Sequence, residues 1–480
     1  MKSILVTIDS RIRLPQGLDA PILTKLRKTF THANPEFYKQ QALGLSTYNV
    51  PRTIATWSDD EGGEMSLPRG GLSRLRDICH DHDLFPRILD RRIKKTPIDW
   101  PEFELVLRDY QEDAVGKAEK HEQGIVRAPT GSGKTAMALA LLGRIRQPAL
   151  VIMRDNNLLE QWKERAVAQA GLAEKEIGIL KGGKKLRIGR RLTLALQQTL
   201  YSASFPMDEV AGEFGAVLVD ECHTVAARTF QRVIDAFPAA HRIGFSADET
   251  RRDKKEFLVY DQFGSVISEV DRADLERDGI VHPVTVRLVP TEFAADWYRD
   301  AEGGDRDFNK LLDQMTNDVA RNELLVQAVR YAMSEGQSPL FIFSHRVDHS
   351  TAIADDYLFR AGIKCGLMLG GEEAATRYAE DKQRLEGGEL DAAAGTFKAI
   401  GQGIDVPNVR GGVLATPIFG NRQFFGQVRG RVCRASKGKN SAFLYVMWDR
   451  HVYPKAPRNL KEWNDGLVEI FERGAWRPAA

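Results

Sequence analysis

The feature that most constrains this chain is a glycine-rich loop, APTGSGKT, at residues 128–135. The short apolar run Ile125-Val126 precedes the loop and predicts a buried strand, while the apolar run at residues 136–142 follows it and predicts a helix. A strand, a glycine loop and a helix in this order are typical of a phosphate-binding loop. Glycines let the backbone N–H groups turn inward, so those groups and the start of the helix face the phosphates. The sequence therefore predicts a phosphate site here.

The last two residues of the loop carry the side chains that such a site needs. Lys134 is expected to reach the β and γ phosphates of a nucleotide, and Thr135 is expected to ligate Mg²⁺. Gln111 lies in a short predicted helix before the loop, and its amide can both donate to and accept from an adenine edge. The other loop residues expected to bind the nucleotide are Pro129, Thr130, Gly131, Ser132 and Gly133.

A pair of carboxylates follows the predicted buried strand at residues 216–219. Polar residues at the carboxyl end of a parallel strand lie where ligands of such sheets bind. Asp220 is suited to hold Mg²⁺ through water, and Glu221 is suited to orient and deprotonate the attacking water. Because the pair follows Lys134 at the chain distance expected of two parts of one phosphate site, we interpret it as catalytic rather than as an ordinary polar loop.

Short apolar strands alternate with helical stretches along most of the chain, which predicts parallel sheets covered on both faces. The expected fold class is therefore α/β. In the first half the predicted strands are residues 149–153, 192–196, 216–219 and 242–245, and residues 158–168 with Trp162 predict a covering helix. A second set of strands begins near Val284 and continues at residues 340–343, 364–368, 392–397, 413–415 and 442–447.

The second set has no phosphate loop and ends in a basic segment, QVRGRVCR, at residues 427–434. An arginine is planar, permanently charged and able to bridge two phosphate oxygens. Arg431 and Arg434 lie three apart, so we expect both on one helix face, where they can point into one cleft. A basic surface helix is the alternative if this segment is considered alone.

Residues 1–95 differ from the rest in having strand-like pieces at 3–8 and 53–57, turns rich in Pro and Gly, and a basic helical stretch at 72–76. They predict a small α+β accessory domain. Its basic residues either bind nucleic-acid phosphates or only form the solvent-exposed surface of a small domain. The sequence leaves both interpretations open. The residues concerned are Lys25, Arg27, Lys28, Arg69 and Arg74.

Length and composition exclude other classes of protein. A chain of 480 residues is too long for one ordinary core, so roughly two to four domains are expected. The hydrophobic content of 42% is typical of globular proteins, and no apolar run is long enough to predict a membrane span. A net charge of only +2 means that nucleic acid would have to be bound by local basic patches. The cysteines form no C-x-x-C pair, which argues against a zinc ribbon or a disulfide framework.

Taken together and in chain order, these segments resemble the motifs of superfamily 2 helicases over residues 100–450. Within that superfamily the chain looks closest to the xeroderma pigmentosum group B type and to phage helicases that remodel branched DNA. The matching segments are residues 108–111 (the adenine-reading segment), 128–135 (motif I), 149–154 through 161–162 (Ia), 194–200 (Ib), 220–223 (a DEAH-like box with Cys third), 246–247 (III), 341–345 (IV), 395–397 through 403–407 (V) and 427–434 (VI).

The resemblance implies two tandem RecA-like domains, residues 96–285 and 286–480, that bind ATP and Mg²⁺ between them, with a short C-terminal tail and the accessory domain at 1–95. The implied catalytic residues are Lys134, Asp220, Glu221, Gln427, Arg431 and Arg434, and the further nucleotide contacts are Arg108, Gln111, Gly403 and Asp405. The implied DNA contacts are Arg154, Gln198, Thr199, Ser344, His345 and Thr396. The residues expected to couple hydrolysis to movement are His223, which with Gln427 bridges the two domains, and Ser246 and Ala247.

Motif III departs from the family pattern, because Asp248-Glu249 follow Ser246-Ala247 where the family usually has Thr. Motif III is thought to link hydrolysis to strand separation, so the departure bears on unwinding and not on hydrolysis. The polar stretch at residues 296–321 is either a long connection or an inserted flap near the duplex junction.

The expected function is that of an ATP-dependent DNA helicase that unwinds or remodels DNA, acting as a monomer in the cytoplasm of a bacterium or a phage-infected cell. A double-strand DNA translocase that does not unwind and an RNA helicase are the alternatives. A catalytically dead scaffold is disfavoured because Lys134, Glu221 and Arg431 are all present.

Overall fold

The computed structural model describes residues 2–60, 63–103, 105–182, 186–224, 228–247, 253–299, 307–371, 373–401, 406, 408–418, 422–434, 439, 441–464 and 466–479. The chain divides into two compact units, Met1–Pro129 with Gly133–Asp271, and Thr130–Ser132 with Arg272–Ala480. No helix among the described residues is both long enough and apolar enough to cross a bilayer.

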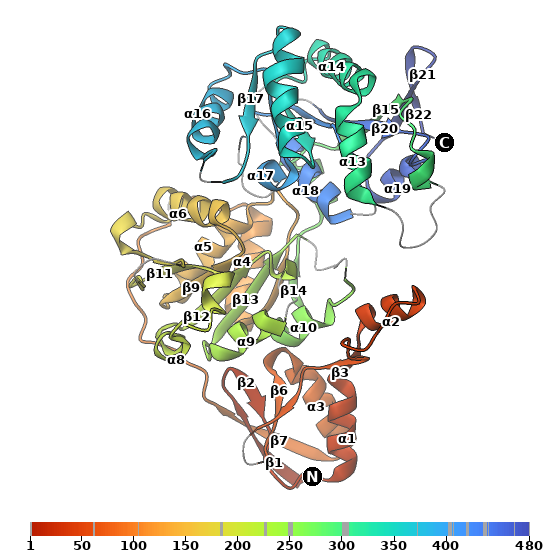
Figure 1. The fold of residues 1–480 in the computed structure, drawn as a ribbon. Coiled ribbons are helices and arrows are strands. Elements are labelled where there is room, and N and C mark those ends of the chain that lie inside the picture. Colours follow the sequence, from red (N-terminus) through yellow and green to blue (C-terminus); the bar gives the residue numbers. More distant parts are fainter. Residues whose placement is uncertain are drawn as a thin grey trace. The chain divides into compact units, whose positions relative to one another are not determined.

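The first unit begins with a small α+β domain (Figure 1). Its five-stranded sheet has the order β5-β6-β2-β1-β7, and β3 and β4 form a separate two-stranded antiparallel sheet. Its core includes the buried side chains of Val6, Ile12, Phe30 and Leu67. The elements are β1 (Lys2–Ile8), β2 (Arg11–Arg13), α1 (Ala20–Thr29), β3 (Thr31–Ala33), α2 (Pro35–Ala42), β4 (Thr53–Ala55), β5 (Ser58–Asp59), β6 (Met65–Pro68), η1 (Arg69–Gly71), α3 (Leu72–Asp81) and β7 (Leu84–Asp90).

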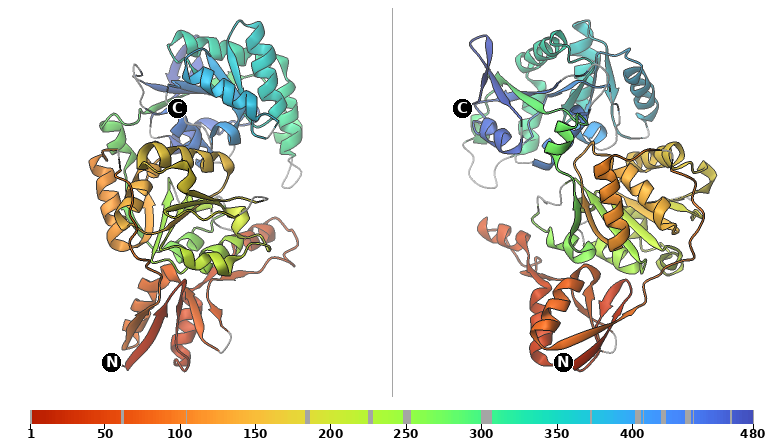
Figure 2. Two further views of the ribbon diagram at one scale, coloured as in Figure 1. Left: turned by 90° about the vertical axis from the view of Figure 1, so that its left-hand side faces the viewer. Right: turned by 180° about the vertical axis from the view of Figure 1, so that it is seen from behind.

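The rest of the first unit is a seven-stranded parallel sheet of order β10-β11-β9-β12-β13-β8-β14. Right-handed crossovers place α4, α5 and α6 on one face and α9 and α10 on the other (Figures 1 and 2). The elements are α4 (Asp109–His121), β8 (Gln123–Arg127), α5 (Lys134–Ile145), β9 (Ala149–Met153), α6 (Asn156–Ala170), η2 (Glu174–Glu176), β10 (Ile177–Leu180), β11 (Leu192–Leu196), α7 (Gln197–Leu200), α8 (Met207–Val210), η3 (Ala211–Glu213), β12 (Ala216–Asp220), η4 (Cys222–Thr224), α9 (Arg228–Ala236), β13 (His241–Ser246), α10 (Phe257–Phe263) and β14 (Val266–Glu269).

The central strands of this sheet are continuous apolar runs because helices cover both faces. Every residue of β9, of β11 and of β12 is buried. All the strands run in one direction, so their carboxyl ends, with the residues that follow them, share one edge of the sheet.

The second unit holds an eight-stranded sheet of order β17-β18-β16-β19-β20-β15-β21-β22, parallel except for the last strand. Helix α14 packs on the face opposite to α18 and α19. The elements are α11 (Arg272–Arg277), β15 (Val284–Thr291), α12 (Asp296–Arg299), α13 (Phe308–Asn317), α14 (Val319–Ser334), β16 (Leu340–Ser344), α15 (Val347–Ala352), the π-helical η6 (Ile353–Leu358), β17 (Cys365–Met368), α16 (Ala375–Glu386), β18 (Ala392–Thr396), α17 (Phe397–Gly401), β19 (Gly411–Leu414), α18 (Arg422–Val432), β20 (Ala442–Asp449), α19 (Ala456–Trp463), β21 (Val468–Glu472) and β22 (Ala475–Pro478).

The small domain is anchored to the large sheet of its own unit by Arg69, which is 2% exposed. Its guanidinium donates to the carbonyl oxygens of Ala239 (2.6 Å) and Ala240 (3.0 Å) and to the side chain of Gln123 (2.5 Å). These partners lie at the amino ends of β13 and β8, at the opposite edge from the carboxyl ends. The hypothesis that Arg69 lies near nucleic-acid phosphates is therefore wrong, because its charge is buried in a domain junction.

Arg74 also serves this junction, since its Nη2 lies 2.5 Å from Asp261 Oδ1 on α10. The other carboxylate oxygen of Asp261 accepts from Thr56 (2.6 Å) and contacts His32 Nε2 (2.9 Å). A fully buried carboxylate with several polar partners keeps its charge satisfied. These contacts join the small domain to α10 of the same unit.

The predicted fold class, with two tandem RecA-like parallel sheets and a small α+β domain, is confirmed. The predicted domain boundaries at residues 95 and 285 stay predictions. In the two large sheets four strands were missed: β10, β14 and the hairpin strands β21 and β22, which extend the second sheet where only a short tail was expected. The stretch at 296–321 contains α12, α13 and the first turn of α14.

Candidate active site

The phosphate loop joins β8 to α5 and has the left-handed backbone that its glycines permit. Gly131 has φ 95° and Gly133 has φ 84°. A Cβ atom on Gly133 would lie 2.4 Å from Nε2 of Gln111, so this position also requires glycine for space. In the division of the chain, Thr130, Gly131 and Ser132 group with the second unit, whereas Pro129, Gly133 and the helix that follows belong to the first.

Lys134, the first residue of α5, lies against the predicted catalytic carboxylate. Its Nζ is 3.1 Å from Glu221 Oε1 and donates to the carbonyl oxygen of Ala128 at 3.3 Å. The structure therefore brings together the end of β8 and the end of β12, which are far apart in sequence.

Glu221 follows β12 with φ 52°, a left-handed conformation that is uncommon for a residue with a side chain. Its second oxygen lies 3.3 Å from His223 Nδ1. Burial raises the pKa of the Glu221 carboxyl, but the Lys134 ammonium and His223 outweigh burial and hold that pKa below its usual range. For Asp220, burial and the adjacent Glu221 carboxylate raise the pKa of the carboxyl above its ordinary value.

Two side chains of α6 contact the predicted Mg²⁺ ligands, and sequence reasoning missed both contacts. Trp162 Nε1 donates to Asp220 Oδ2 at 2.7 Å, and Arg165 Nη1 donates to Thr135 Oγ1 at 2.8 Å. Trp162 was predicted only as part of a covering helix. The spacing of three residues between Trp162 and Arg165 places both on one helix face, but the sequence does not show what that face meets.

The residues expected to couple hydrolysis to movement lie next to the carboxylates. His223 Nδ1 is 2.7 Å from Ser246 Oγ at the end of β13, and both side chains are buried. Ala247 follows and is half-buried. Asp248 and Glu249, the departure in motif III, lie outside the described residues.

Gln111 caps the helix that precedes the loop. Its side-chain oxygen accepts from the backbone N–H of Arg108 at 3.0 Å, and its Nε2 lies against Gly133. Gln111 is 5% exposed. The structure thus places Gln111 beside the phosphate loop, and the adenine-reading role of Arg108 and Gln111 stays a prediction.

Two of the three predicted DNA contacts of the first unit line a cavity of about 510 Å³ at the ends of β10 and β11. Gln198 and Thr199 line this cavity together with Lys181 and with Asn156, the first residue of α6. Thr199 Oγ1 accepts from the N–H of Gly182 at 2.9 Å. Arg154, just before α6, is exposed.

The predicted DNA contacts of the second unit gather at the corresponding edge of its sheet. Ser344 and Thr396 end the paired strands β16 and β18 and lie directly opposite each other. The backbone N–H of His345 donates to Thr416 Oγ1 at 2.9 Å, and the ring Nδ1 of His345 lies 2.8 Å from the same oxygen. Burial lowers the pKa of His345 to about 4, so the ring is neutral at pH 7.

Helix α18 carries Gln427 and Arg431. The expectation that Arg431 and Arg434 share one helix face is wrong, because the helix ends at Val432 and Arg434 pairs with Val281 in an isolated bridge. Beside this bridge the backbone N–H of His282 donates to the carbonyl oxygen of Cys433 at 2.6 Å. Gly403 and Asp405 lie outside the described residues.

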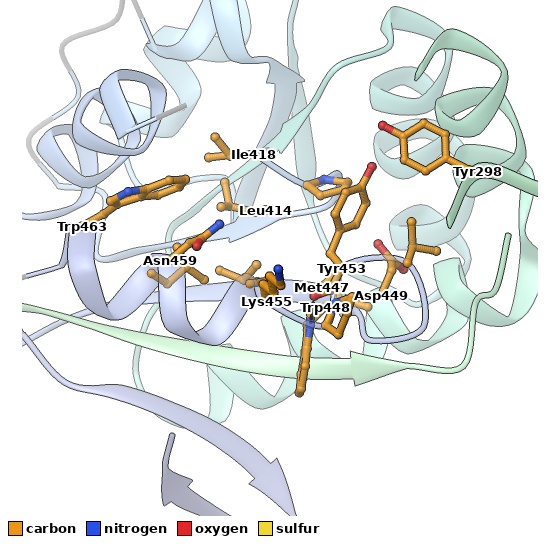
Figure 3. Close-up of a pocket in the computed structure, with 16 residues that line it drawn as sticks. Tyr298, Leu414, Ile418, Met447, Trp448, Asp449, Tyr453, Lys455, Asn459 and Trp463 are labelled. Carbon is orange, nitrogen blue, oxygen red and sulfur yellow. Dashed lines mark hydrogen bonds between the residues drawn. The ribbon is translucent and has the colours of Figure 1, made fainter. Parts of the chain in front are cut away.

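A second cavity, of about 350 Å³, lies within the second unit at the ends of β19 and β20 (Figure 3). Trp448, Tyr453 and Trp463 contribute aromatic rings to its wall, and Lys455 and Asn459 of the α19 region contribute polar groups. None of the predicted site residues that the structure describes lines it.

Comparisons with known proteins agree with this geometry. Residues 104–250 match the family model described as type III restriction enzyme, res subunit. The chain is 28% identical over 350 residues to a protein named Rad25 from Halobacterium salinarum (72% of this chain, 54% of the relative). It is 26% identical over 365 residues to the DNA 3'-5' helicase XPB of Kineococcus radiotolerans (74% of this chain, 61% of the relative). This chain thus spans little more than half the length of these relatives.

Among solved structures, a fragment assigned as an HsdR subunit of a type I restriction enzyme from Vibrio vulnificus has the same fold, with a TM-score of 0.54 and 17% identity over 96% of this chain and 85% of the other. The predicted resemblance to superfamily 2 DNA helicases, of the xeroderma pigmentosum group B type in particular, is confirmed by these comparisons.

Proposed function

We propose that this chain hydrolyses ATP to move along DNA and separate or remodel its strands. The observation that carries the proposal is the contact between Lys134 and Glu221 at 3.1 Å, beside Asp220, at the carboxyl edge of a parallel sheet. This arrangement places a cation that can bind phosphate beside a carboxylate that can orient and deprotonate water. The names of the relatives, DNA 3'-5' helicase among them, support DNA as the partner and 3' to 5' as the direction.

The residues present fit a divalent cation. Thr135 and Asp220 offer a hydroxyl and a carboxylate, the oxygen ligands that Mg²⁺ prefers, and both are less than a tenth exposed. When bound with ATP, Mg²⁺ would neutralise charge on the β and γ phosphates.

The Lys134–Glu221 pair also suggests how the base is controlled. The ion pair with Lys134 lowers the pKa of the Glu221 carboxyl. Phosphates would draw the ammonium toward themselves, and the pKa of Glu221 would then rise as that pairing weakens. The carboxylate would become a better base at the moment when substrate is in place.

DNA binding is proposed at the cavity near Thr199 and at the edge formed by Ser344 and Thr396. Both sites present hydroxyls, amides and backbone groups, which suit backbone contacts that tolerate any sequence. From the resemblance alone, we propose that Arg431 stabilises the transferring phosphoryl group and that the protein is cytoplasmic.

Double-strand translocation without unwinding is a second candidate, and the Asp248-Glu249 departure in motif III favours it. A strand-displacement assay beside a triplex-displacement assay distinguishes the two. A translocase of this kind displaces the third strand of a triplex but leaves a forked duplex intact.

The deciding experiment measures ATP turnover by the purified chain with single-stranded DNA, forked DNA, a four-way junction and an RNA duplex. We expect DNA to stimulate turnover and Lys134→Ala to abolish it. Stimulation by RNA alone would contradict the DNA assignment, and absence of turnover with every nucleic acid would contradict the enzyme.

A further inference from the structure

The cavity of the second unit lies on the same edge of its sheet as the predicted DNA contacts. Ser344 ends β16 and Thr396 ends β18, and the ends of β19 and β20 line the cavity. These parallel strands have the order β18-β16-β19-β20, so β20 lies two strands from β16, which is roughly 10 Å at 4.8 Å per strand. A single DNA strand bound at the predicted contacts is therefore close enough to place a base in the cavity.

The walls of the cavity are aromatic, and the contacts between their side chains order them (Figure 3). Trp448 Nε1 donates to the carbonyl oxygen of Tyr453 at 2.8 Å, which orients the indole. The rings of Tyr453 and Tyr298 meet edge to face with centroids 6.1 Å apart, and Trp463 of α19 adds a further ring. A space of about 350 Å³ between ordered rings suits a flat aromatic ligand, and proteins that bind single strands hold bases by such stacking.

The segment at residues 450–461, which forms part of the cavity wall, has the charge that complements a nucleic acid. It contains four Lys or Arg and no Asp or Glu. Lys455 lines the cavity and is exposed. The carboxylate of Asp449, which also lines the cavity, is paired with Arg321 at 2.7 Å and adds no net negative charge. The other basic residues of the segment are Lys461, Arg450, which pairs with Glu292, and Arg458, which pairs with Glu462.

Asn459, in the first turn of α19, supplies a group that can read the edge of a base. Its side chain lines the cavity and is half-buried. Within the part of the chain that the structure describes, this amide makes no hydrogen bond. An amide offers a donor and an acceptor side by side, and the N7 and N6 atoms of adenine offer the complementary acceptor and donor.

We propose that this cavity binds an adenine base of a single DNA strand, with the base among the aromatic rings, its N6 and N7 edge on Asn459 and its phosphate beside Lys455. The inference deepens the proposed function and rests on it. It adds a base preference to DNA contacts that otherwise involve only the backbone. The site differs from the predicted contact with the adenine of ATP, which involves Gln111 of the first unit.

The test measures, by fluorescence anisotropy, how tightly the full chain binds a labelled 12-residue oligodeoxyadenylate. A second oligonucleotide carries 7-deazaadenine, in which a C–H group replaces N7 and removes one partner of Asn459. We expect the parent chain to bind natural adenine threefold to tenfold more tightly than 7-deazaadenine. Asn459→Ala should lose the same factor with natural adenine and should not distinguish the two oligonucleotides. Alanine favours helices, so α19 should persist in this variant.

Gln383→Ala is the matched control, because it removes an exposed amide from α16 in the same unit. We expect it to change either affinity less than twofold. Trp463→Leu removes a ring but no partner of N7, so it should weaken binding of both oligonucleotides threefold to tenfold and keep the preference for natural adenine. Thermal melting checks that each variant is folded, and Asn459→Ala decides the test if Trp463→Leu does not fold.

The inference would be overturned if Asn459→Ala kept both the affinity and the adenine preference of the parent chain, or if the parent chain did not distinguish the two oligonucleotides. Free deoxyadenosine monophosphate that displaced the labelled strand at equal concentration would also overturn it, because the occupant would then be a mononucleotide. All these outcomes leave the proposed function intact. A parent chain that bound neither oligonucleotide would instead refute the proposed action on DNA, and this inference with it.

Discussion

The two large sheets place their first seven strands in the same order, yet different residues follow those strands. Strands β8 to β14 of the first unit correspond, in chain order and position, to β15 to β21 of the second. The glycine loop follows β8, whereas Glu292-Phe293 follow β15. The same topology therefore has the predicted phosphate loop after one strand and a different sequence after the corresponding strand.

The strand registers make this comparison exact to the residue. Ala149 pairs with Ala216 in the first sheet, and Leu340 pairs with Gly411 in the second. Counting along β12 and β19 from these pairs, Thr416 occupies the position of Glu221. Polar residues suited to DNA follow β11 and end β18, so this property occurs in both copies whereas the carboxylates occur in one.

The largest effect is expected from the arginine that the second unit alone supplies. Arg431→Ala should lower kcat about 10³–10⁵-fold, the usual contribution of an arginine at a phosphoryl transition state, while nucleotide binding persists. Arg422→Ala, exposed at the start of the same helix, is the control and should leave turnover unchanged. Full turnover by Arg431→Ala would show that the second sheet contributes nothing to hydrolysis.

Equivalent positions in the two sheets should respond differently. Glu221→Gln should lower ATP turnover about 10²–10⁴-fold, because the base is lost, and should still bind ATP. Thr416→Val removes the partner of His345 but no catalytic group, so its basal turnover should remain. Steady-state turnover and equilibrium nucleotide binding measure both effects, and equal losses in the two variants would break the comparison.

The predicted DNA-contact positions, which occur in both sheets, should respond alike to substitution, and more weakly than the predicted catalytic positions. Thr199→Ala and Thr396→Ala each remove a hydroxyl that accepts from a backbone N–H, at 2.9 Å from Gly182 and 3.2 Å from Ala399. Each should weaken binding of a single-stranded oligonucleotide roughly threefold to tenfold, in line with about 1 kcal/mol for a hydrogen bond. Thr24→Ala on α1 is the exposed control. Fluorescence anisotropy measures the binding of the oligonucleotide. A loss of affinity in only one of the two variants would contradict the comparison.

A separate effect, on stability and not on activity, concerns the response to acid. His349 contacts Ser344 (2.9 Å) and Asn322 (3.0 Å), and burial with the nearby Arg321 lowers its pKa to about 3. As the pH falls below about 6.5, His349 becomes protonated in the unfolded chain but not in the folded chain. The free energy of unfolding therefore decreases as the pH falls from about 6.5 to the pKa of the folded state. The free energy of unfolding should drop by up to about 1.4 kcal/mol per pH unit in this window.

Thermal melting between pH 7 and pH 5 checks this expectation, with His349→Gln as the comparison. The variant should lose less stability on acidification than the parent chain. An identical pH profile in the two chains would mean that His349 is protonated in the folded state.

The sequence alone determined the parts that are local. A glycine loop between a strand and a helix, and a carboxylate pair after a buried strand, carry their chemistry within a few residues, so Lys134, Thr135, Asp220 and Glu221 could be predicted as site residues without a fold. The strands at 149–153 and 192–196 were predicted at their observed bounds, because a fully buried strand is a continuous apolar run.

Only the tertiary structure decided which distant groups meet. Trp162 and Arg165 look like parts of a covering helix until β12 and α5 bring Asp220 and Thr135 to them. The sequence makes Arg69 a candidate phosphate ligand, whereas in the structure its guanidinium donates to the carbonyl oxygens of Ala239 and Ala240. Sequence pattern records which side chains are polar, whereas burial and hydrogen-bond partners depend on elements separated by tens of residues, and these settle what each charge does.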